Sequence, residues 1–295
     1  MNIPKYIKNQ KNVIGFSKDE VYNKSDYILE TDRILLSGSD EVYLFLNNLK
    51  KKNIDILIKE NANFKIFLLS YNSRKTKINL NVEIEANALL KLYSNFIPKN
   101  KTSLKVKREF NLAYKSSLIL LNNITYNGSF DLFDEVNLNQ ELANLDIDLL
   151  NIGSNLDMIN VDQYVNHNAK RTYSQINNWL ISDKASKLNY SVNGTINRGK
   201  ELSNCNQLNK GIILSKNGEI KVEPKLFIDE YNVKASHGAA IGQIDEDQLF
   251  YLLSRGLSEL QAKNLIISGY INPFINKIKN KRLEKQLITK INRLI

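Results

Sequence analysis

The sequence predicts a mainly β protein that ends in a helical region. Apolar and polar residues alternate over 77–85, KINLNVEIE, a period of two that is typical of a half-buried strand. After Gly242 the apolar spacing becomes helical. Shorter strand-like stretches lie at 64–69, 103–107, 146–149, 191–193, 212–214, 220–222 and 226–228. Such short strands at short intervals predict a sandwich, a barrel or a β-solenoid, and periodicity does not choose among these because no strict repeat length is visible.

The N-terminal part of the chain is expected to be a small mixed region that includes a helix. An apolar-periodic segment over 42–49 follows Asp40-Glu41 and precedes three lysines, and this order of charges suits a helix dipole. The stretch FKIFLL at 64–69 then predicts a buried strand. These patterns divide the chain into a shortened α/β region at 1–65, a β core at 66–243 and a helical domain at 244–295.

The C-terminal region contains three helix start signals and two stop signals. The starts are Asp245 with Gln248, Ser258 with Gln261, and Asn272-Pro273, and the stops are Gly256 and Gly269. The first helix is expected to direct Leu249, Leu252 and Leu253 inward. The tail over 275–295 has an amphipathic helical pattern, which favours packing onto its neighbours over binding to a membrane surface.

Composition excludes several functional classes. The net charge of +10 is spread along the chain and lacks an RNA-binding aromatic signature, so we expect no nucleic-acid partner. No apolar run reaches the roughly 18 to 20 residues of a membrane span, so no membrane partner is expected either. A single cysteine, Cys205, rules out an internal disulfide and fits a reducing compartment. The basic N-terminus has no apolar signal core, so we expect a cytoplasmic protein, or one of a plastid-type organelle in a eukaryote.

One of only two histidines, His237, lies between small residues in the stretch SHGAA. A histidine flanked by such residues, where a strand pattern gives way to a helical one, can approach a partner surface closely. The alternative is that Gly238 and the alanines make a tight strand-to-helix turn and leave the imidazole in solvent. The bare pattern favours this second interpretation.

A glycine-rich segment at 194–200, GTINRGK, matches the spacing of a phosphate-binding loop. The next residue is Glu201, where magnesium coordination requires Ser or Thr, and no amphipathic helix follows. We therefore reject a nucleotide site and expect Gly194 at a turn between strands. A Ser/His/Asp hydrolase is also unsupported, because no nucleophile-elbow motif is present. The sequence thus provides no catalytic residues.

The segment from Val233 to Tyr270 resembles the C-terminal signature of the SufB/SufD family of iron–sulfur cluster assembly proteins. Gly at position 238, where SufB members usually have Glu, favours the SufD members. A looser match over 160–235 includes His167, and no dependable match precedes residue 150. The matching residues are Val233, Ser236-His237-Gly238-Ala239, Gly242, Asp245, Leu249-Phe250-Tyr251-Leu252, Ser254-Arg255-Gly256, Ala262 and Gly269-Tyr270.

The resemblance implies a right-handed parallel β-helix over 66–243, followed by a C-terminal helical domain. It implies a scaffold subunit, not an enzyme, that pairs with a SufB-like subunit and docks a SufC-like ATPase. His237 would then be a ligand for a transient iron–sulfur cluster shared with the partner, although Ala235 replaces a cysteine that is usual in the family. The helical residues implied to bind the ATPase are Leu249, Phe250, Tyr251 and Arg255.

Imidazole and thiolate are the ligands suited to iron–sulfur chemistry, and the chain has few of them. For Cys205 the interpretation as a buried core residue is favoured over that as a ligand, and His167 is interpreted as a hydrogen-bonded structural residue. Two other functions stay open: a sole, homodimeric SufB/SufD-type scaffold, and a carbohydrate-active β-helix enzyme. The enzyme would need acids gathered on one face of the rod, whereas the strand carboxylates are scattered along the sequence. The sequence does not reveal whether a flavin binds.

Overall fold

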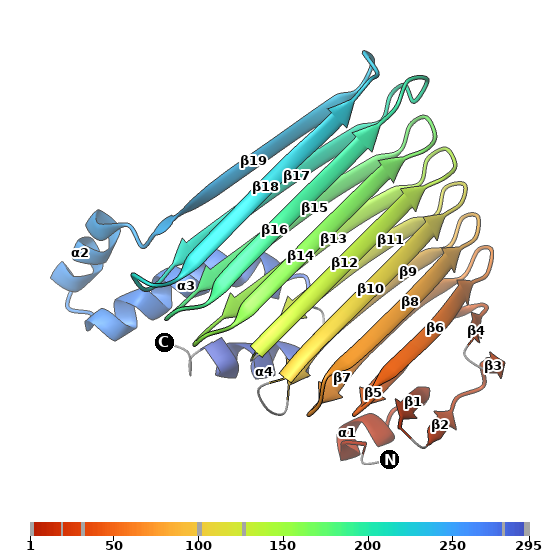
Figure 1. Ribbon diagram of the computed structural model, residues 1–295, viewed down its shortest axis with the longest axis horizontal. Helices are drawn as coiled ribbons and strands as arrows, with labels where there is room; N and C mark the ends of the chain where they lie inside the picture. The colour runs from red at the N-terminus through yellow and green to blue at the C-terminus, as the bar shows by residue number, and fades with distance from the viewer. Residues whose placement is uncertain are drawn as a thin grey trace.

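Two parallel sheets face each other and form a flattened β-solenoid (Figure 1). The computed structural model describes residues 3–18, 20–30, 33–98, 102–125, 128–278 and 281–291. From β4 onward successive strands alternate between a ten-stranded and a nine-stranded sheet, so each strand from β6 to β17 is bonded to the strands two places before and after it. The predicted mainly β fold with a parallel β-helical core is thereby confirmed.

The ten-stranded sheet is here called sheet A and the nine-stranded sheet is called sheet B. Among the described strands, all neighbouring pairs within these sheets are parallel except two N-terminal pairs, β1–β2 and β3–β4. Sheet A contains β1 (Val13–Ser17), β2 (Val21–Lys24), β5 (Ser39–Asn47), β7 (Asn63–Asn72), β9 (Leu89–Pro98), β11 (Ser117–Ile124), β13 (Asn144–Gly153), β15 (Tyr173–Ser182), β17 (Asn204–Ile213) and β19 (Lys234–Gln243). Sheet B contains β3 (Ile28–Glu30), β4 (Arg33–Leu36), β6 (Lys51–Ile58), β8 (Thr76–Ile84), β10 (Thr102–Leu112), β12 (Gly128–Leu138), β14 (Met158–His167), β16 (Lys187–Ile196) and β18 (Glu219–Ile228).

The coils keep their register although their lengths differ. The residue facing Ser39 on the next coil is Asn63, whereas the residue facing Tyr173 is Asn204, so the coil lengthens from 24 to 31 residues. One corner of each coil is closed by a non-glycine residue with a left-handed backbone, a conformation in which asparagine is enriched. These corner residues are Asn61, Asn87, Lys115, Leu142, Arg171 and Leu202. Because neither length nor residue type repeats, no period is visible in the sequence.

The strand predictions at 64–69 and 77–85 are confirmed by β7 and β8, and those at 103–107, 146–149 and 191–193 by β10, β13 and β16. The stretches 220–222 and 226–228 belong to one strand, β18, which continues through Pro224. An edge strand tolerates proline, since one side of its backbone has no ladder partner.

The helix predicted at 42–49 is wrong, because this segment forms β5 and the turn after it. Val42, Leu44 and Leu46 point into the solenoid, while Tyr43 and Phe45 are buried on the outer face of sheet A. A strand buried on both faces has continuous apolar residues and loses its alternation, so it can imitate helical spacing.

Four helices accompany the sheets: α1 (Lys5–Lys8), α2 (Glu246–Ser254), α3 (Glu259–Ile275) and α4 (Lys281–Ile291). The predicted starts of α2 and α3 are confirmed: the Asp245 side chain accepts a hydrogen bond from the Gln248 backbone, and Ser258 forms a capping box with Gln261. Gly256 ends α2 with φ +90°. The predicted stop at Gly269 and the predicted helix start at Asn272-Pro273 are both wrong, because α3 continues through Pro273 to Ile275. Pro273 removes one backbone hydrogen bond from the helix, a cost that the packing of its last turn on sheet A offsets.

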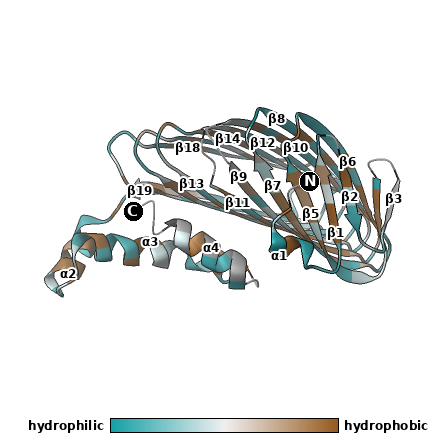
Figure 2. Cartoon of the chain, turned by 90° about the horizontal axis from the view of Figure 1, so that it is seen from below, coloured by the Kyte–Doolittle hydropathy of each residue, from teal (hydrophilic) through white to brown (hydrophobic). Residues whose placement is uncertain are grey.

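Helices α3 and α4 cover the outer face of sheet A, as seen from below in Figure 2. Phe274 of α3 packs near Trp179 of β15, and Leu287 of α4 joins the same apolar cluster. Lys277 donates a hydrogen bond to Asp148 at 2.5 Å. The expected packing of the tail onto its neighbours is therefore confirmed for the described part of α4.

Helix α2 differs from the prediction, because none of its residues is buried. Leu249 and Leu252 are only half-buried, and Leu253 is exposed. The division of the chain at residues 65 and 243 stays a prediction, although strands before residue 65 already form the first coils of both sheets.

A buried ion pair lies inside the solenoid, between β10 and β12. Arg108 and Asp134 have exposed fractions of 0% and 1%, and they form two hydrogen bonds of 2.7 and 2.5 Å. Arg108 Nη1 also donates to Ser94 Oγ at 2.8 Å and to Asn122 Oδ1 at 3.0 Å. The pair thus tolerates burial because both charges are compensated in geometry that matches the guanidinium fork.

We expect Asp134→Leu to lower the free energy of unfolding by about 3–5 kcal/mol, because it leaves the Arg108 charge buried without its partner. The double variant Arg108→Leu with Asp134→Leu should recover most of that loss. Chemical denaturation of the three proteins measures both effects. A double variant no more stable than Asp134→Leu would contradict this account.

Candidate functional site

The solenoid has an open C-terminal end. Strands β18 and β19 are the last members of sheets B and A, and each has a hydrogen-bonded neighbour on one side only among the described strands. Their other edges present unpaired backbone N–H and C=O groups, which can pair with another chain. Phe227, Ile228 and Tyr231 are exposed close to this end. The open end is therefore the most accessible place for a partner.

His237 lies in the middle of β19, at this open end, and is exposed. The predicted strand-to-helix turn at Gly238 and the following alanines is wrong, because β19 continues to Gln243 before α2 begins. Small residues fill the strand around the histidine, and Gly238 has only one neighbouring atom within 4 Å of an added Cβ. The predicted close access to the imidazole therefore results from an edge strand with small side chains.

The register places His237 on the inner side of the solenoid. It faces Gln207 of β17, which in turn faces Ile176 of β15, and both of these side chains are buried. Ala235 and Ala239 face the buried Cys205 and Asn209 in the same way. The imidazole thus belongs to the inward column of the last coil, where no further coil covers it within the described chain.

Cys205 lies one coil further in and is completely buried. Its thiol is hydrogen-bonded to Ser174, whose Oγ is 2.9 Å from His167 Nε2, and His167 Nδ1 is 2.7 Å from Thr172 Oγ1. The opposite strand makes room through Gly194, where an added Cβ would lie 2.5 Å from Cys205 Sγ. Gly194 is thus inside β16 and not at a turn as predicted, and its role is to admit the thiol.

Burial decides the protonation of both groups. It raises the pKa of the Cys205 thiol, with the hydrogen bond to Ser174 acting in the opposite direction. It lowers the pKa of His167 to about 4, so this ring is neutral at physiological pH. A buried protonated thiol is a poor metal ligand, because the thiolate is the ligating form. This environment supports the interpretations of Cys205 as a core residue and of His167 as a structural one.

Within the described residues no group of three or more His, Cys, Asp or Glu side chains is arranged to hold a metal ion. Iron–sulfur clusters need about four ligands, chiefly thiolates. His237 by itself offers one exposed imidazole at an open edge, so a cluster bound there would need further ligands from outside the described chain.

The helical residues predicted to bind a partner lie apart from His237, on α2. Phe250 and Tyr251 are 73% and 55% exposed, and the Arg255 guanidinium lies over the Tyr251 ring at 5.2 Å. Leu249 is half-buried. A shallow hollow of about 650 Å³ adjoins these residues at the turn between α2 and α3 and includes Arg255, Leu257 and Leu265. Exposed aromatic and arginine side chains beside a hollow lined by both leucine and polar side chains are typical of protein interfaces.

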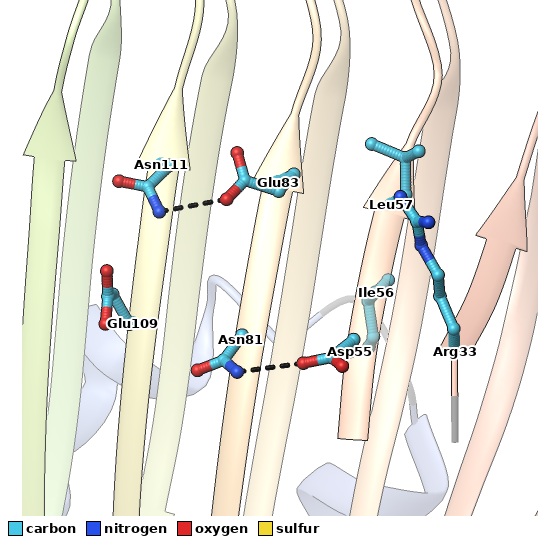
Figure 3. Close-up of a pocket in the computed structure, with 8 residues that line it drawn as sticks. All are labelled: Arg33, Asp55, Ile56, Leu57, Asn81, Glu83, Glu109 and Asn111. Atoms are coloured by element: carbon cyan, nitrogen blue, oxygen red, sulfur yellow. Dashed lines mark hydrogen bonds between the residues drawn. The ribbon is translucent and has the colours of Figure 1, made fainter. Parts of the chain in front are cut away.

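A second hollow, of about 430 Å³, lies on the outer face of sheet B near the N-terminal coils (Figure 3). It gathers Asp55, Glu83 and Glu109, which sequence reasoning treated as scattered, because coil stacking could not be read from the chain. Asp55 accepts a hydrogen bond from Asn81 and Glu83 accepts one from Asn111, each on the next coil. Two of the three carboxylates thus belong to ladders that join neighbouring coils.

Comparison with known proteins agrees with this architecture of a parallel solenoid followed by docked helices. Residues 47–270 match the family model described as SUF system FeS cluster assembly, SufBD core domain. The chain belongs to this SufB/SufD family. The match extends well before residue 150, where sequence inspection found no dependable similarity.

Individual relatives include SufD proteins from two bacteria. The chain is 34% identical to SufD of Bacillus subtilis over 116 residues, which is 39% of the chain and 26% of that protein. It is 29% identical to SufD of Escherichia coli over 157 residues, 52% of the chain and 36% of that protein. SufB of Bacillus subtilis is 32% identical over 129 residues, 44% of the chain and 27% of that protein. The matched segments therefore span about a quarter to a third of these relatives.

No helix in the described part of the chain is long and apolar enough to cross a membrane.

Two buried amides of β17, Gln207 and Asn209, lie on its inner side directly beneath β19, an arrangement that the sequence did not indicate. They occupy the inward positions of β17 whose coil neighbours are His237 and Ala239. Cys205, Gln207 and Asn209 are every second residue of β17, and only the strand register shows that this set of side chains faces inward. Polar residues at inward positions read as surface residues in the sequence, so no local signal could have identified them.

We expect acid to destabilise the protein through His167. Its pKa is 6.5 when unfolded and about 4 when folded, so the unfolded chain binds the extra proton first. This contribution should be complete above pH 6.5 and should decline by about 3 kcal/mol as pH falls to 4. Urea denaturation across this range should show that His167→Gln removes this part of the pH dependence, whereas His237→Gln, at an exposed position, retains it. Equal pH dependence in His167→Gln and the unmodified protein would refute the assignment.

Proposed function

We propose that this chain is a scaffold subunit of a SufBCD-type complex that assembles iron–sulfur clusters. In this proposal the open end of the solenoid pairs with a SufB-like subunit, and α2 docks a SufC-like ATPase. The observation with most weight is the exposed imidazole of His237 on an unpaired edge strand. Membership in the SufB/SufD family supports the general role in cluster assembly.

The edge geometry explains why pairing and cluster assembly would occur at one place. A second solenoid that adds a strand to β19 would extend sheet A and cover the inward column that ends at His237. The partner would also supply the ligands that the described part of this chain lacks. The nascent cluster is the cargo of this interface and not a resident cofactor.

The contact between α2 and the SufC-like ATPase would supply the complex with the free energy of ATP hydrolysis. The segment at 194–200 forms the end of β16 and a turn, so it has no helix N-terminus to hold a phosphate. ATP hydrolysis would therefore occur in the partner bound to α2, and its movement would reach the open end through the short connection between α2 and β19. On this proposal the chain itself is not an enzyme.

The compartment follows from the relatives and belongs to the same proposal. Bacterial SufD proteins and a chloroplastic protein of Arabidopsis thaliana, 30% identical over 112 residues, are similar to this chain. We place the complex in the cytoplasm, or in a plastid-type organelle if the source is eukaryotic.

We expect His237→Ala to abolish most iron and sulfide incorporation by the co-expressed complex while the complex still forms. Ser236→Ala is the matched control, because it is the exposed neighbour in β19 and its hydroxyl bonds to Asn206. Anaerobic purification, size-exclusion chromatography and iron and sulfide analysis measure both properties. Unchanged cluster content in His237→Ala would refute the site.

The same co-expression distinguishes the homodimeric alternative. If the chain assembles clusters as a dimer without a SufB-like subunit, pairing with SufB is refuted and the chain is the sole scaffold. The carbohydrate-enzyme alternative gains no support from the hollow on sheet B, because two of its three acids are bonded to amides of the next coil.

We expect the double variant Phe250→Ala with Arg255→Ala to weaken binding of the SufC-like ATPase by at least about 30-fold, the effect of losing an interface anchor. No residue of α2 is buried, so the fold should be unaffected. Lys263→Ala on the neighbouring helix α3 is the control, since this side chain forms an i,i+4 ion pair with Glu259 at the surface of its own helix. Isothermal titration calorimetry measures the affinities, and equal affinity for all three proteins would refute docking at α2.

A further inference from the structure

Two buried amides stand behind the exposed histidine at the open end. Gln207 is 3% exposed and Asn209 is completely buried, and both lie on the inner side of β17, directly beneath β19. Buried amide groups are costly unless each donor and acceptor is bonded, so their arrangement requires an explanation.

Asn209 connects the terminal strand to the interior. Its Nδ2 donates to the backbone carbonyl of Gly238, the residue that follows His237, at 3.3 Å. Its Oδ1 accepts from Asn178 Nδ2 at 2.8 Å, and the same Nδ2 lies 3.0 Å from Gln163 Oε1. A chain of buried amides therefore ends on the peptide next to the imidazole.

Gln207 is the coil neighbour of His237 itself. Its Nε2 donates to the backbone carbonyl of Lys225 at 3.2 Å, which fixes the amide across the solenoid. Its Oε1 is buried and has no hydrogen-bond partner within the described chain. The ring of a neutral histidine has one N–H to donate, and the bond made by one ring nitrogen determines which nitrogen is left to act as a ligand.

We infer that Gln207 and Asn209 are positioning residues for His237: rotation of the exposed imidazole brings its N–H to the unpartnered Gln207 oxygen, which then orients the ring, and Asn209 holds the backbone of β19 beside it. One ring nitrogen then points outward, past the edge of the last coil. The functional meaning of this arrangement rests on the proposed role of His237, but the positioning itself is a property of the isolated chain.

The test uses the full chain without partner or cluster, uniformly labelled with ¹⁵N. Only two histidines contribute imidazole signals, and buried His167 serves as an internal reference for the fold. We expect Gln207→Met, which keeps the shape but removes the acceptor, to shift the His237 ring nitrogens toward the mixed tautomers of a free imidazole. The His167 signals should stay unchanged.

Asn209→Leu tests the second contact. We expect backbone amide exchange over 234–243 to rise about fivefold to tenfold, the factor that corresponds to one lost hydrogen bond. The matched control is Asn151→Leu, because Asn151 is equally buried on the inner side of sheet A and bonds to Tyr190 Oη at 2.7 Å, far from β19 in coil order. It should leave both the exchange over 234–243 and the His237 signals unchanged.

The inference is overturned if the His237 ring signals in Gln207→Met match those of the unmodified protein, or if Asn209→Leu and Asn151→Leu show equal exchange over 234–243. These outcomes are independent of cluster assembly. Conversely, cluster assembly unaffected by His237→Ala would refute the proposed function and leave the positioning intact.

Discussion

The structure depends on parallel coil stacking in strict register. Each inward side chain packs on the residue at the same position of the next coil, so a column such as Leu44, Leu68, Ser94 and Asn122 runs through sheet A from one end toward the other. Parallel pairing satisfies the backbone of every interior strand, but it leaves the last strand of each sheet with an unpaired edge. The same constraint therefore stabilises the rod and creates the surface at which it can be extended.

The interior changes character along these columns. Apolar residues, among them Phe16 and Phe64, fill most of the first coils, whereas Arg108 and Asp134, and further on Gln163, Asn178 and Asn209, occupy inward positions of later coils. Polar groups in a low-dielectric interior require specific partners, so they fix side-chain orientation more narrowly than aliphatic packing does. The polar part of the interior ends at the strand that contains His237, where precise orientation would be most useful for a shared ligand.

The outer faces differ as well, and this difference explains where prediction failed. Helices α1, α3 and α4 pack on the apolar outer face of sheet A, and Tyr43 and Phe45 of β5 belong to this outer cluster, so β5 lost its alternation and imitated a helix. Strands exposed on sheet B, such as β8, kept the alternation and were predicted correctly. Helix caps were also predicted correctly at Asp245 and Ser258, since a cap depends on residues three apart in the chain. The continuation of α3 through Pro273 was missed, because packing on sheet A outweighs the local stop signal.

The sequence by itself determined the strand-rich core, the capped C-terminal helices and the short motif around His237, because these depend on contacts between near neighbours in the chain. Only the tertiary structure decided that His237 lies within an edge strand, that Gly194 makes room for Cys205, and that Gln207 and Asn209 lie behind the imidazole. Each of these relations joins residues about 11 to 30 positions apart through a coil whose length varies, and no local pattern encodes such a register.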